Sequence, residues 1–500
     1  MNLWKKYDAA FQHHAQNKAF CIADQFYSYA EFRQFVSASQ LLIQLHAGKT
    51  TGLPIGVMCH DSIETFAAIF ATWFLGHHFV PLHPQHPAAL NNEKIQQSGL
   101  QLVVSSEESE ACAQLTVPCI VNKNLKSTTP YQVANHPGRA YILFTSGSTG
   151  KTKGVPITEQ NMVAYMDGFL SLYPELKDSD RFLQTYDLTS DAAFTGYLIP
   201  LMLGACVYTL PTGGFKYLSI VKLLQQHRIT FTKFTPSVLN YLRPYFKSMH
   251  FDTLQHSHFG GEALPYELAR EWAKCIPNAE ISNGYGPTET TVTCTIHRTP
   301  VSLLSEKVYN GIVSIGKPFK EVKTIIVDEN NKTVAQGEKG ELCIGGPQLM
   351  EGYLNGEADS GKWLYLKDEK GIQERYYRSG DVVIQDQEGY LFFCGRKDEQ
   401  LKISGYRVEP AEIEMAISRL TSGRKSKAYG YRNPSGTDSI VVFVEQCDET
   451  ENTLKDQLRT LLPLPLIPEK IIFIPQFPIN SSGKADKNAL FENYASRIYE

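Results

Sequence analysis

The sequence contains ten cysteines, but no two of them have C-x-x-C spacing. It also has no apolar run long enough for a membrane span, because its most apolar stretch, residues 66–76, covers 11 residues where a span needs roughly 20. We interpret this stretch as a buried helix. The first residues contain two lysines and no long apolar run, so a signal peptide is not expected. These absences predict a cytoplasmic protein with reduced, mostly buried thiols and no membrane contact.

The sequence also lacks an excess of charge of one sign, since its net charge is −4. This balance gives no electrostatic reason to expect a nucleic acid or an anionic membrane as a partner. The histidines never take the helical H-x-x-x-H spacing, so we expect no metal site built from them. With 42% apolar and 20% charged residues over 500 positions, the composition indicates a globular protein of two or more domains, which we expect to be a monomer.

Alternation of short β-rich runs with amphipathic helical stretches predicts α/β layers in the first part of the chain. The runs are at residues 53–59, 101–106, 140–146 and 205–210, and helical stretches are at 65–76 and 217–229. Residues 322–346 instead indicate a β-meander or small barrel with a polar turn. A helix is predicted from Pro410, with a small α/β unit after it, and the charged segment 395–400 is the best candidate hinge.

The segment 144–154, "FTSGSTGKTKG", suggests a phosphate-binding loop but fails the Walker pattern. That pattern requires a glycine five positions before Gly150, where this chain has Thr145. Its hydroxyls, glycines and lysines are still suited to holding a polyanion. The alternative is a solvated Gly/Ser turn, and the other motifs of the sequence decide between the two.

Six segments in order supply that context. They are the loop 145–154, "GGEALP" (260–265), "NGYGPTETT" (283–291), "YRSGDVV" (377–383), "GRKDEQLKISGYRVEPAEIE" (395–414) and "NSSGKADKNAL" (480–490). Together they resemble the adenylate-forming (ANL) superfamily over nearly the whole chain. The residues of these motifs are most similar to those of stand-alone amino-acid adenylation domains of non-ribosomal peptide synthetases and of D-alanine–carrier-protein ligases. This resemblance implies an N-terminal AMP-binding domain (1–395), a hinge (396–398) and a small mobile α+β C-terminal domain (399–500).

The resemblance also implies an ATP site with Mg²⁺. Tyr285 would stack on adenine, Thr288 would bond the α-phosphate, Glu289 would hold Mg²⁺ and Asp381 would bind both ribose hydroxyls. The alternatives are a core aromatic residue, a helix cap and an ordinary Asp after a glycine turn. The chain departs from the family at Thr152, where most members have proline. The full predicted ATP-binding set is Thr145, Ser146, Gly147, Ser148, Thr149, Gly150, Lys153, Gly261, Glu262, Tyr285, Gly286, Thr288, Asp381 and Arg396.

Two lysines match catalytic positions of the family. Lys484 corresponds to the lysine that reaches the site during adenylation, as a point charge on a long stem. Lys402 lies beside Gly405 on the segment that faces the site during thioester formation, after rotation about the hinge residue Asp398. For either lysine the alternative is a solvated surface residue, which is the usual place of lysine.

The acyl site has Asp191 as the candidate partner of a substrate ammonium, with Asp187 as a rival register. Asp191 can alternatively cap a helix. Gly260 and Gly284 are expected to leave room for the substrate. A buried Lys233 ammonium favours an anion or an amide oxygen, and the combination of pocket residues resembles family pockets for aspartate and asparagine. The resemblance thus implies a polar or acidic side chain of that size, unless Lys233 snorkels outward or pairs with a protein acid, in which case alanine fits. The pocket set that the resemblance implies is Asp191, Ala192, Thr195, Lys233, His258, Gly260, Gly284, Val292 and Thr293.

The sequence lacks a "GG-x-S" phosphopantetheine-attachment motif and an "HH-x-x-x-D-G" condensation motif, so it has no acyl acceptor of its own. The resemblance therefore implies ATP-dependent activation of an amino acid and transfer to a separate carrier protein. An acyl- or aryl-CoA ligase of the same fold would lack both motifs too, and remains the main alternative. A catalytically silent nucleotide-binding module is a third possibility, which the presence of Lys484, Glu289 and Asp381 disfavours.

Overall fold

The computed structural model describes residues 2–135, 138–146, 152–211, 216–354, 356, 361–367, 371–398, 400–447, 449–479 and 485–499. The chain separates into two compact units. The larger comprises Met1–Pro84, Lys94–Phe144 and Gly154–Lys397, and the smaller comprises Asp398–Glu500 with the short segments Gln85–Glu93 and Thr145–Lys153. The predicted class, α/β with a large N-terminal and a small C-terminal part, is confirmed.

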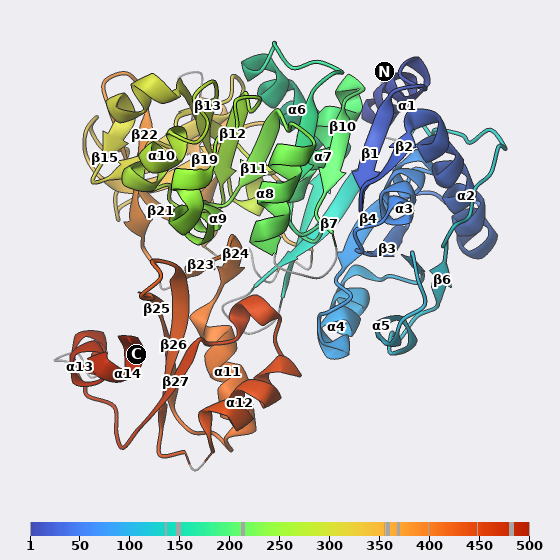
Figure 1. Ribbon diagram of the computed structural model, residues 1–500. Helices are drawn as coiled ribbons and strands as arrows, with labels where there is room; N and C mark the ends of the chain where they lie inside the picture. Colours follow the sequence, from blue (N-terminus) through green and yellow to red (C-terminus); the bar gives the residue numbers. More distant parts are fainter. Residues whose placement is uncertain are drawn as a thin grey trace. The chain divides into compact units, whose positions relative to one another are not determined.

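A nine-stranded sheet is the largest layer of the larger unit (Figure 1). Its six central strands run parallel, and the pairings at both edges are antiparallel. In order across the sheet the strands are β17 (Lys317–Pro318), β14 (Thr295–Pro300), β13 (Glu280–Tyr285), β12 (His256–Gly260), β11 (Phe231–Phe234), β9 (Arg181–Gln184), β10 (Cys206–Thr209), β1 (Lys18–Ile22) and β2 (Gln25–Ser28).

Helices cover both faces of this sheet. On one face, α8 (Lys216–Gln226), α9 (Pro236–Leu242) and α10 (Tyr266–Ala273) pack on Phe234 and Phe259. On the other face, α6 (Glu159–Leu172) and α7 (Ala192–Leu203) pack near Phe231, whose ring centroid lies 6.4 Å from that of Phe169 in α6. Alternate residues of each strand point to opposite faces, so this second face also receives the strand residues that form the candidate site.

A six-stranded sheet forms the second layer of the fold. Its order is β6 (Cys119–Val121), β5 (Val103–Ser105), β3 (Pro54–Met58), β4 (His78–Leu82), β7 (Arg139–Thr145) and β8 (Lys153–Thr158). The associated helices are α1 (Leu3–His13), α2 (Tyr29–Ala47), α3 (Ile63–Phe74), α4 (Ala88–Ser98) and α5 (Glu110–Ala113). Every residue of α3 is buried, which confirms the buried helix predicted from the apolar run. The strands predicted at 53–59, 101–106, 140–146 and 205–210 are β3, β5, β7 and β10.

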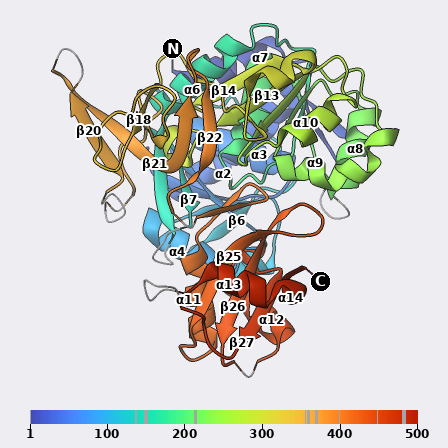
Figure 2. The ribbon, with the colours of Figure 1, turned by 90° about the vertical axis from the view of Figure 1, so that its left-hand side faces the viewer.

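The β-rich segment predicted at residues 322–346 is part of an antiparallel sheet. It contains β18 (Lys323–Val327), β19 (Gly340–Gly345), β21 (Gln373–Gln385), β20 (Trp363–Lys367) and β22 (Leu391–Arg396). Figure 2 shows the ribbon of β20 and β21 extending outward from the unit. Two further short strands, β15 (Val308–Tyr309) and β16 (Ile312–Val313), pair with each other.

The smaller unit has a three-stranded sheet and a separate two-stranded hairpin. The sheet contains β25 (Ser426–Arg432), β26 (Asp438–Glu445) and β27 (Lys470–Ile474), and the hairpin contains β23 (Leu401–Ile403) and β24 (Tyr406–Val408). Helices α11 (Pro410–Leu420), α12 (Glu451–Arg459), α13 (Lys487–Asn493) and α14 (Ala495–Tyr499) complete it. As predicted, α11 begins at Pro410, whose missing N–H costs nothing in a first helical turn.

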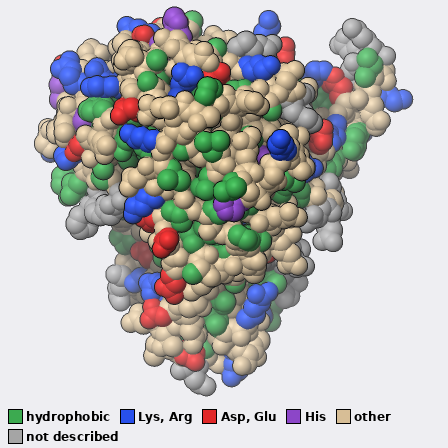
Figure 3. Space-filling view, turned by 90° about the vertical axis from the view of Figure 1, so that its right-hand side faces the viewer, with side chains coloured by type: hydrophobic (Ala, Val, Ile, Leu, Met, Phe, Trp, Pro, Cys, Tyr) green, Lys and Arg blue, Asp and Glu red, His purple; other side chains and the backbone are tan. Residues whose placement is uncertain are grey.

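The charged side chains on the surface and the state of the cysteines can be compared with the balanced charge and the cysteine spacing of the sequence. Basic and acidic side chains are interspersed over the face in Figure 3. All ten cysteines are unpaired, and six of them are buried. Among the described residues, no helix is both long and apolar enough to cross a membrane.

Candidate active site

Three neighbouring parallel strands place a row of polar side chains on one face of the large sheet. The register pairs Lys233 of β11 with His258 of β12, and His258 with Ser282 of β13. Paired residues on adjacent strands share a face, so the three side chains point the same way. The ring of His258 lies against Phe169 of α6, with centroids 5.9 Å apart, which identifies the face as the one that α6 and α7 cover.

Lys233 is held inside the protein. Its side chain is 3% exposed, and its Nζ donates a hydrogen bond to Oγ1 of Thr195 in α7 at 2.6 Å. The same hydroxyl is 2.7 Å from the hydroxyl of Tyr165, and the Lys233 ammonium lies 5.5 Å from the centre of the Tyr186 ring. Burial lowers the pKa of Lys233, and the negative charge of Asp191 opposes that shift. Lys233 therefore does not snorkel to solvent.

Asp191 directly precedes α7 but forms no side-chain hydrogen bond that caps the helix. Its Oδ2 atom is buried and has no hydrogen-bond partner among the residues that the structure describes. Burial raises the pKa of this carboxyl, Lys233 opposes the rise and Glu289 adds to it. Asp191 thus presents a carboxylate oxygen that needs a partner, which the alternative role as a helix cap does not explain.

Asp187, the rival candidate, is already engaged. Its Oδ2 is 2.8 Å from Nε2 of His83, and its Oδ1 accepts hydrogen bonds from the backbone N–H and the hydroxyl of Thr189, both at 2.8 Å. Burial alone would raise the pKa of Asp187, but the interactions with His83 and Thr189 lower it. Both oxygens of Asp187 are therefore engaged, whereas Asp191 keeps one oxygen without a partner among the described residues, which favours Asp191 as the group that meets a substrate.

The glycines of the predicted pocket do not simply leave room for a ligand. A Cβ atom on Gly284 would lie 2.9 Å from Nε2 of His258 and 3.0 Å from Cγ2 of Thr293, and one on Gly260 would lie 3.1 Å from the carbonyl oxygen of Gly284. The expectation for Gly284 is therefore wrong in its reason. The missing side chain makes space for the His258 ring, because the two residues lie on neighbouring strands and a larger residue would displace the imidazole.

Glu289 lies in a turn that follows β13. It belongs to the 3₁₀ helix η2 (Thr288–Thr290), is fully buried, and accepts a 2.5 Å hydrogen bond from the hydroxyl of Tyr353. The next two residues, Thr291 and Val292, have φ values of 57° and 65°. Left-handed backbone is rare for β-branched residues and is retained only where the surroundings enforce it.

Gln348 enforces this turn. Its side-chain amide donates hydrogen bonds to the carbonyl oxygens of Thr290, Thr291 and Thr293 at 3.1, 3.1 and 2.9 Å. The Thr291 hydroxyl in turn donates a hydrogen bond to the backbone carbonyl oxygen of Gln348 at 2.7 Å. Sequence reasoning missed Gln348, because it lies outside every recognised motif and nothing local marks a residue that bonds a distant turn.

We expect Gln348→Met to lower the free energy of unfolding by about 2–4 kcal/mol, because buried carbonyls lose their donor and the strained turn loses its support. Urea denaturation followed by tryptophan fluorescence measures this loss. Gln336→Met is the matched control, since Gln336 makes one exposed side-chain bond, to the carbonyl of Asp386. Equal destabilisation by the two substitutions would contradict the role assigned to Gln348.

The predicted ribose ligand, Asp381, is also buried and bonded. Its Oδ1 accepts a hydrogen bond from Arg396 at 2.6 Å, and its Oδ2 accepts one from the hydroxyl of Tyr285 at 2.6 Å. Pairing of β21 with β22 sets Asp381 opposite Arg396. Burial raises the pKa of Tyr285, and Asp381 adds to the rise. The structure thus brings together three predicted ATP-binding residues from three different motifs.

The remaining predicted residues occupy turns and strand ends. Gly261 and Glu262 follow β12, and the Glu262 carboxylate accepts hydrogen bonds from the backbone N–H and hydroxyl of Ser237 at 2.9 and 3.1 Å. Gly286 follows β13, where a Cβ atom would lie 2.8 Å from the carbonyl oxygen of Val292. Ala192 begins α7, and both Val292 and Thr293 are buried.

In the predicted phosphate loop, Thr145 ends β7, Ser146 follows it, and Lys153 begins β8. Gly147, Ser148, Thr149 and Gly150 lie outside the described residues, and so does Lys484.

In the smaller unit, Lys402 lies on β23, and Ser404 and Gly405 form the two-residue turn to β24 with φ values of 51° and 82°. Two consecutive left-handed residues are the conformation of a type I′ hairpin turn. Asp398 is the first residue of the C-terminal segment of the smaller unit, and its Oδ1 accepts a 3.4 Å hydrogen bond from the backbone N–H of Gln400.

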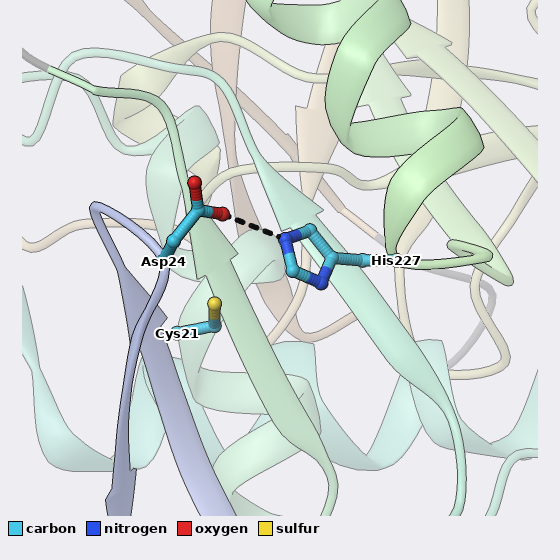
Figure 4. Close-up of side chains that lie close together, drawn as sticks. All are labelled: Cys21, Asp24 and His227. Atoms are coloured by element: carbon cyan, nitrogen blue, oxygen red, sulfur yellow. Dashed lines mark hydrogen bonds and ion pairs between the residues drawn. The ribbon is translucent and has the colours of Figure 1, made fainter.

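Among the described residues, two groups of side chains that could ligate a metal lie outside this site. In Figure 4, Cys21, Asp24 and His227 approach one another, with Oδ1 of Asp24 2.9 Å from Nε2 of His227. Burial raises the pKa of the Cys21 thiol to about 11, and Lys222 also approaches Asp24, at 3.5 Å. The second group, Glu175, His256 and Glu280, has both carboxylates paired with Arg298. We interpret both as structural contacts. Each group includes residues that are far apart in the sequence and meet only in the tertiary structure, so a search for closely spaced ligands could not find them.

Comparison with known proteins identifies the family. A family model described as AMP-binding enzyme matches residues 7–354. One of the plipastatin synthase proteins of Bacillus subtilis (strain 168) is 30% identical over 447 residues, which are 87% of this chain and 12% of that protein. Two further plipastatin synthase proteins of the same organism are also 30% identical. The chain spans only 12–18% of the length of these three relatives.

Solved structures share the fold. The Vibrio cholerae adenylation domain AlmE, in complex with glycyl-adenosine-5′-phosphate, is 25% identical with a TM-score of 0.82, covering 98% of this chain and 97% of that one. The o-succinylbenzoate CoA synthetase MenE of Bacillus subtilis has a TM-score of 0.83 at 19% identity, covering 98% of each chain, which is a likeness of fold alone. From the family match, the ordered motifs and this site, we conclude that the chain belongs to the AMP-binding enzyme family of adenylate-forming ligases.

Proposed function

We propose that this enzyme activates an amino acid with a polar or acidic side chain and transfers it to the phosphopantetheine thiol of a separate carrier protein. In the first step an oxygen of the substrate carboxylate bonds to the α-phosphorus of ATP, and the bond to pyrophosphate breaks. In the second, the thiol sulfur attacks the carbonyl carbon of the adenylate and AMP leaves. Both steps bring anions together, so the site must supply positive charge and hydrogen-bond donors.

The observation that supports an amino acid is the unpartnered Oδ2 of Asp191. A buried carboxylate oxygen requires a donor, and a substrate α-ammonium is a charged donor that satisfies it. A carboxylic acid without an amine would leave this Asp191 oxygen without a donor and would bring a second negative charge toward it. The geometry therefore favours amino-acid activation over an acyl- or aryl-CoA ligase.

The nucleotide would be held by residues of the larger unit. Tyr285 would contact adenine, Asp381 the ribose hydroxyls, and Thr288 the α-phosphate. Glu289 fits Mg²⁺, because this ion binds through one or two carboxylates together with phosphate oxygens, and the Tyr353 hydroxyl orients the Glu289 carboxylate. When bound, the ion would neutralise phosphate charge.

Residues of the smaller unit complete the proposal. The loop at Thr145–Lys153 would cover the β- and γ-phosphates, and Lys484 would bridge the substrate carboxylate and ATP during adenylation. Rotation about Asp398 would then bring Lys402 and Gly405 to the site for thioester formation, since two segments cannot occupy one site together.

The test is amino-acid-dependent exchange of labelled pyrophosphate into ATP, followed by transfer of the labelled acyl group to a phosphopantetheinylated carrier protein or to free CoA. We expect exchange with a polar or acidic amino acid, none with succinate or benzoate, and transfer to the carrier in preference to CoA. Exchange driven by an acid without an amine would instead establish a CoA-ligase-like enzyme. Nucleotide binding with no exchange for any acid would leave only a binding module.

A further inference from the structure

A chain of hydrogen bonds fixes the protonation of His258. The hydroxyl of Tyr173 donates to Oγ of Ser282 at 2.7 Å, and this Oγ lies 2.9 Å from Nδ1 of His258. Because Ser282 accepts from Tyr173, its own single hydrogen is available for Nδ1. His258 is fully buried beside the Lys233 ammonium, and both effects hold its pKa well below the usual value, so the ring is neutral. A neutral ring that accepts at Nδ1 carries its hydrogen on Nε2.

The Nε2–H group therefore faces the site as a donor. Nε2 is buried, has no hydrogen-bond partner among the described residues, and lies directly above Gly284. Lys233 is its neighbour on the adjacent strand, and among the described residues its ammonium hydrogen-bonds only Thr195. Lys233 and His258 are thus two neighbouring hydrogen-bond donors on this face. They match a ligand group that has only hydrogen-bond acceptors.

Charge makes the requirement more specific. If Asp191 binds the α-ammonium, the Lys233 ammonium is left without a compensating anion from the row of residues on this face. A carboxylate on the substrate side chain would restore neutrality and accept from both Lys233 and His258. A side-chain amide has one acceptor oxygen, and its NH₂ group would turn further hydrogens toward the two donors.

We infer that the substrate is an amino dicarboxylate such as aspartate, and that His258 is a specificity-determining residue, with Tyr173 and Ser282 as positioning residues that set its tautomer. This inference rests on the proposed function and names its substrate class. Neither Tyr173 nor Ser282 belongs to the pocket set expected from the sequence, because their effect is transmitted through the His258 ring.

The first test compares pyrophosphate exchange with aspartate, asparagine and alanine. We expect the wild type to prefer aspartate over asparagine by at least about tenfold in kcat/KM, because a site with buried donors discriminates strongly against a ligand that cannot accept from them. His258→Leu should remove most of that preference, and His258→Gln, which keeps an N–H donor, should retain part of it. Ser282→Ala should lower the preference several-fold through KM for aspartate, with little change in kcat.

Ser257→Ala is the matched control, since Ser257 lies on the same strand as His258 but on the opposite face, bonded to Nε1 of Trp272 at 3.0 Å. It is expected to alter stability without changing the aspartate-to-asparagine ratio. A wild type that prefers asparagine or alanine overturns the inference while leaving amino-acid activation in place. Absence of exchange with every amino acid overturns the proposed function itself.

The second test does not depend on activity. Nitrogen-15 NMR of histidine-labelled protein distinguishes the two neutral tautomers, with His258→Gln identifying the resonance. We expect the wild-type ring to carry its proton on Nε2, and Ser282→Ala to shift the tautomer equilibrium. A ring protonated on Nδ1, or one that is charged at neutral pH, would overturn the assignment of His258 as a neutral Nε2–H donor.

Discussion

Asp191→Asn is expected to lower kcat/KM for amino-acid-dependent pyrophosphate exchange by about 100-fold or more, while ATP binding is retained. The substitution keeps the size of the side chain but removes the charge that compensates the α-ammonium. Removing one partner of a buried ion pair costs about 3–5 kcal/mol, which corresponds to a factor of roughly 100 to 1,000 or more. Steady-state exchange kinetics and titration with a fluorescent ATP analogue measure the two effects separately.

Asp187→Asn is the control for register, because the two carboxylates lie on the same segment and the sequence allowed either. Asp187 is bonded to His83 and Thr189, so its substitution should reduce stability through these lost contacts. The amino-acid dependence of exchange in the folded fraction should remain. If Asp187→Asn abolished exchange and Asp191→Asn left it unchanged, the assignment of the ammonium ligand would be wrong.

The elements that the sequence predicted well are those with strong local signals. The apolar run that became α3 and the short β-rich runs that became β3, β5, β7 and β10 are specified by their own residues. The order of strands in the sheets is not local information. It decides that Lys233, His258 and Ser282, which are separated by 24 or more residues in the chain, lie side by side on neighbouring strands.

The candidate site divides in the same way. Tyr285, Glu289 and Asp381 belong to motifs whose residues match those of the family, so the resemblance could identify them. Gln348 and Tyr353, which hold this part of the site, belong to no recognised motif. Only the tertiary structure brings them into contact with Thr290 and Glu289. Gly284 illustrates a further limit, because a glycine in a predicted pocket indicates that space is needed without saying which neighbouring side chain fills it.

Asp381→Asn is expected to weaken ATP binding by about 100-fold and to lower the free energy of unfolding by about 3 kcal/mol. Two hydrogen bonds from ribose hydroxyls to a carboxylate contribute about 1.5 kcal/mol each, and an amide oxygen is a weaker acceptor. The stability loss has a separate cause, because the side chain of Arg396 is 10% exposed and loses the carboxylate that faces it at 2.6 Å. Isothermal titration with ATP and urea denaturation measure the two quantities.

Tyr285→Phe separates these two contributions. It removes the hydroxyl that donates to Asp381 but keeps the aromatic ring that would contact adenine, so the carboxylate and its pairing with Arg396 remain. One neutral donor lost to a charged acceptor corresponds to a smaller effect, about tenfold or less in ATP affinity. If Tyr285→Phe weakened ATP binding as much as Asp381→Asn does, the main role of Asp381 would be to orient Tyr285, and the assignment of its carboxylate to the ribose hydroxyls would be wrong.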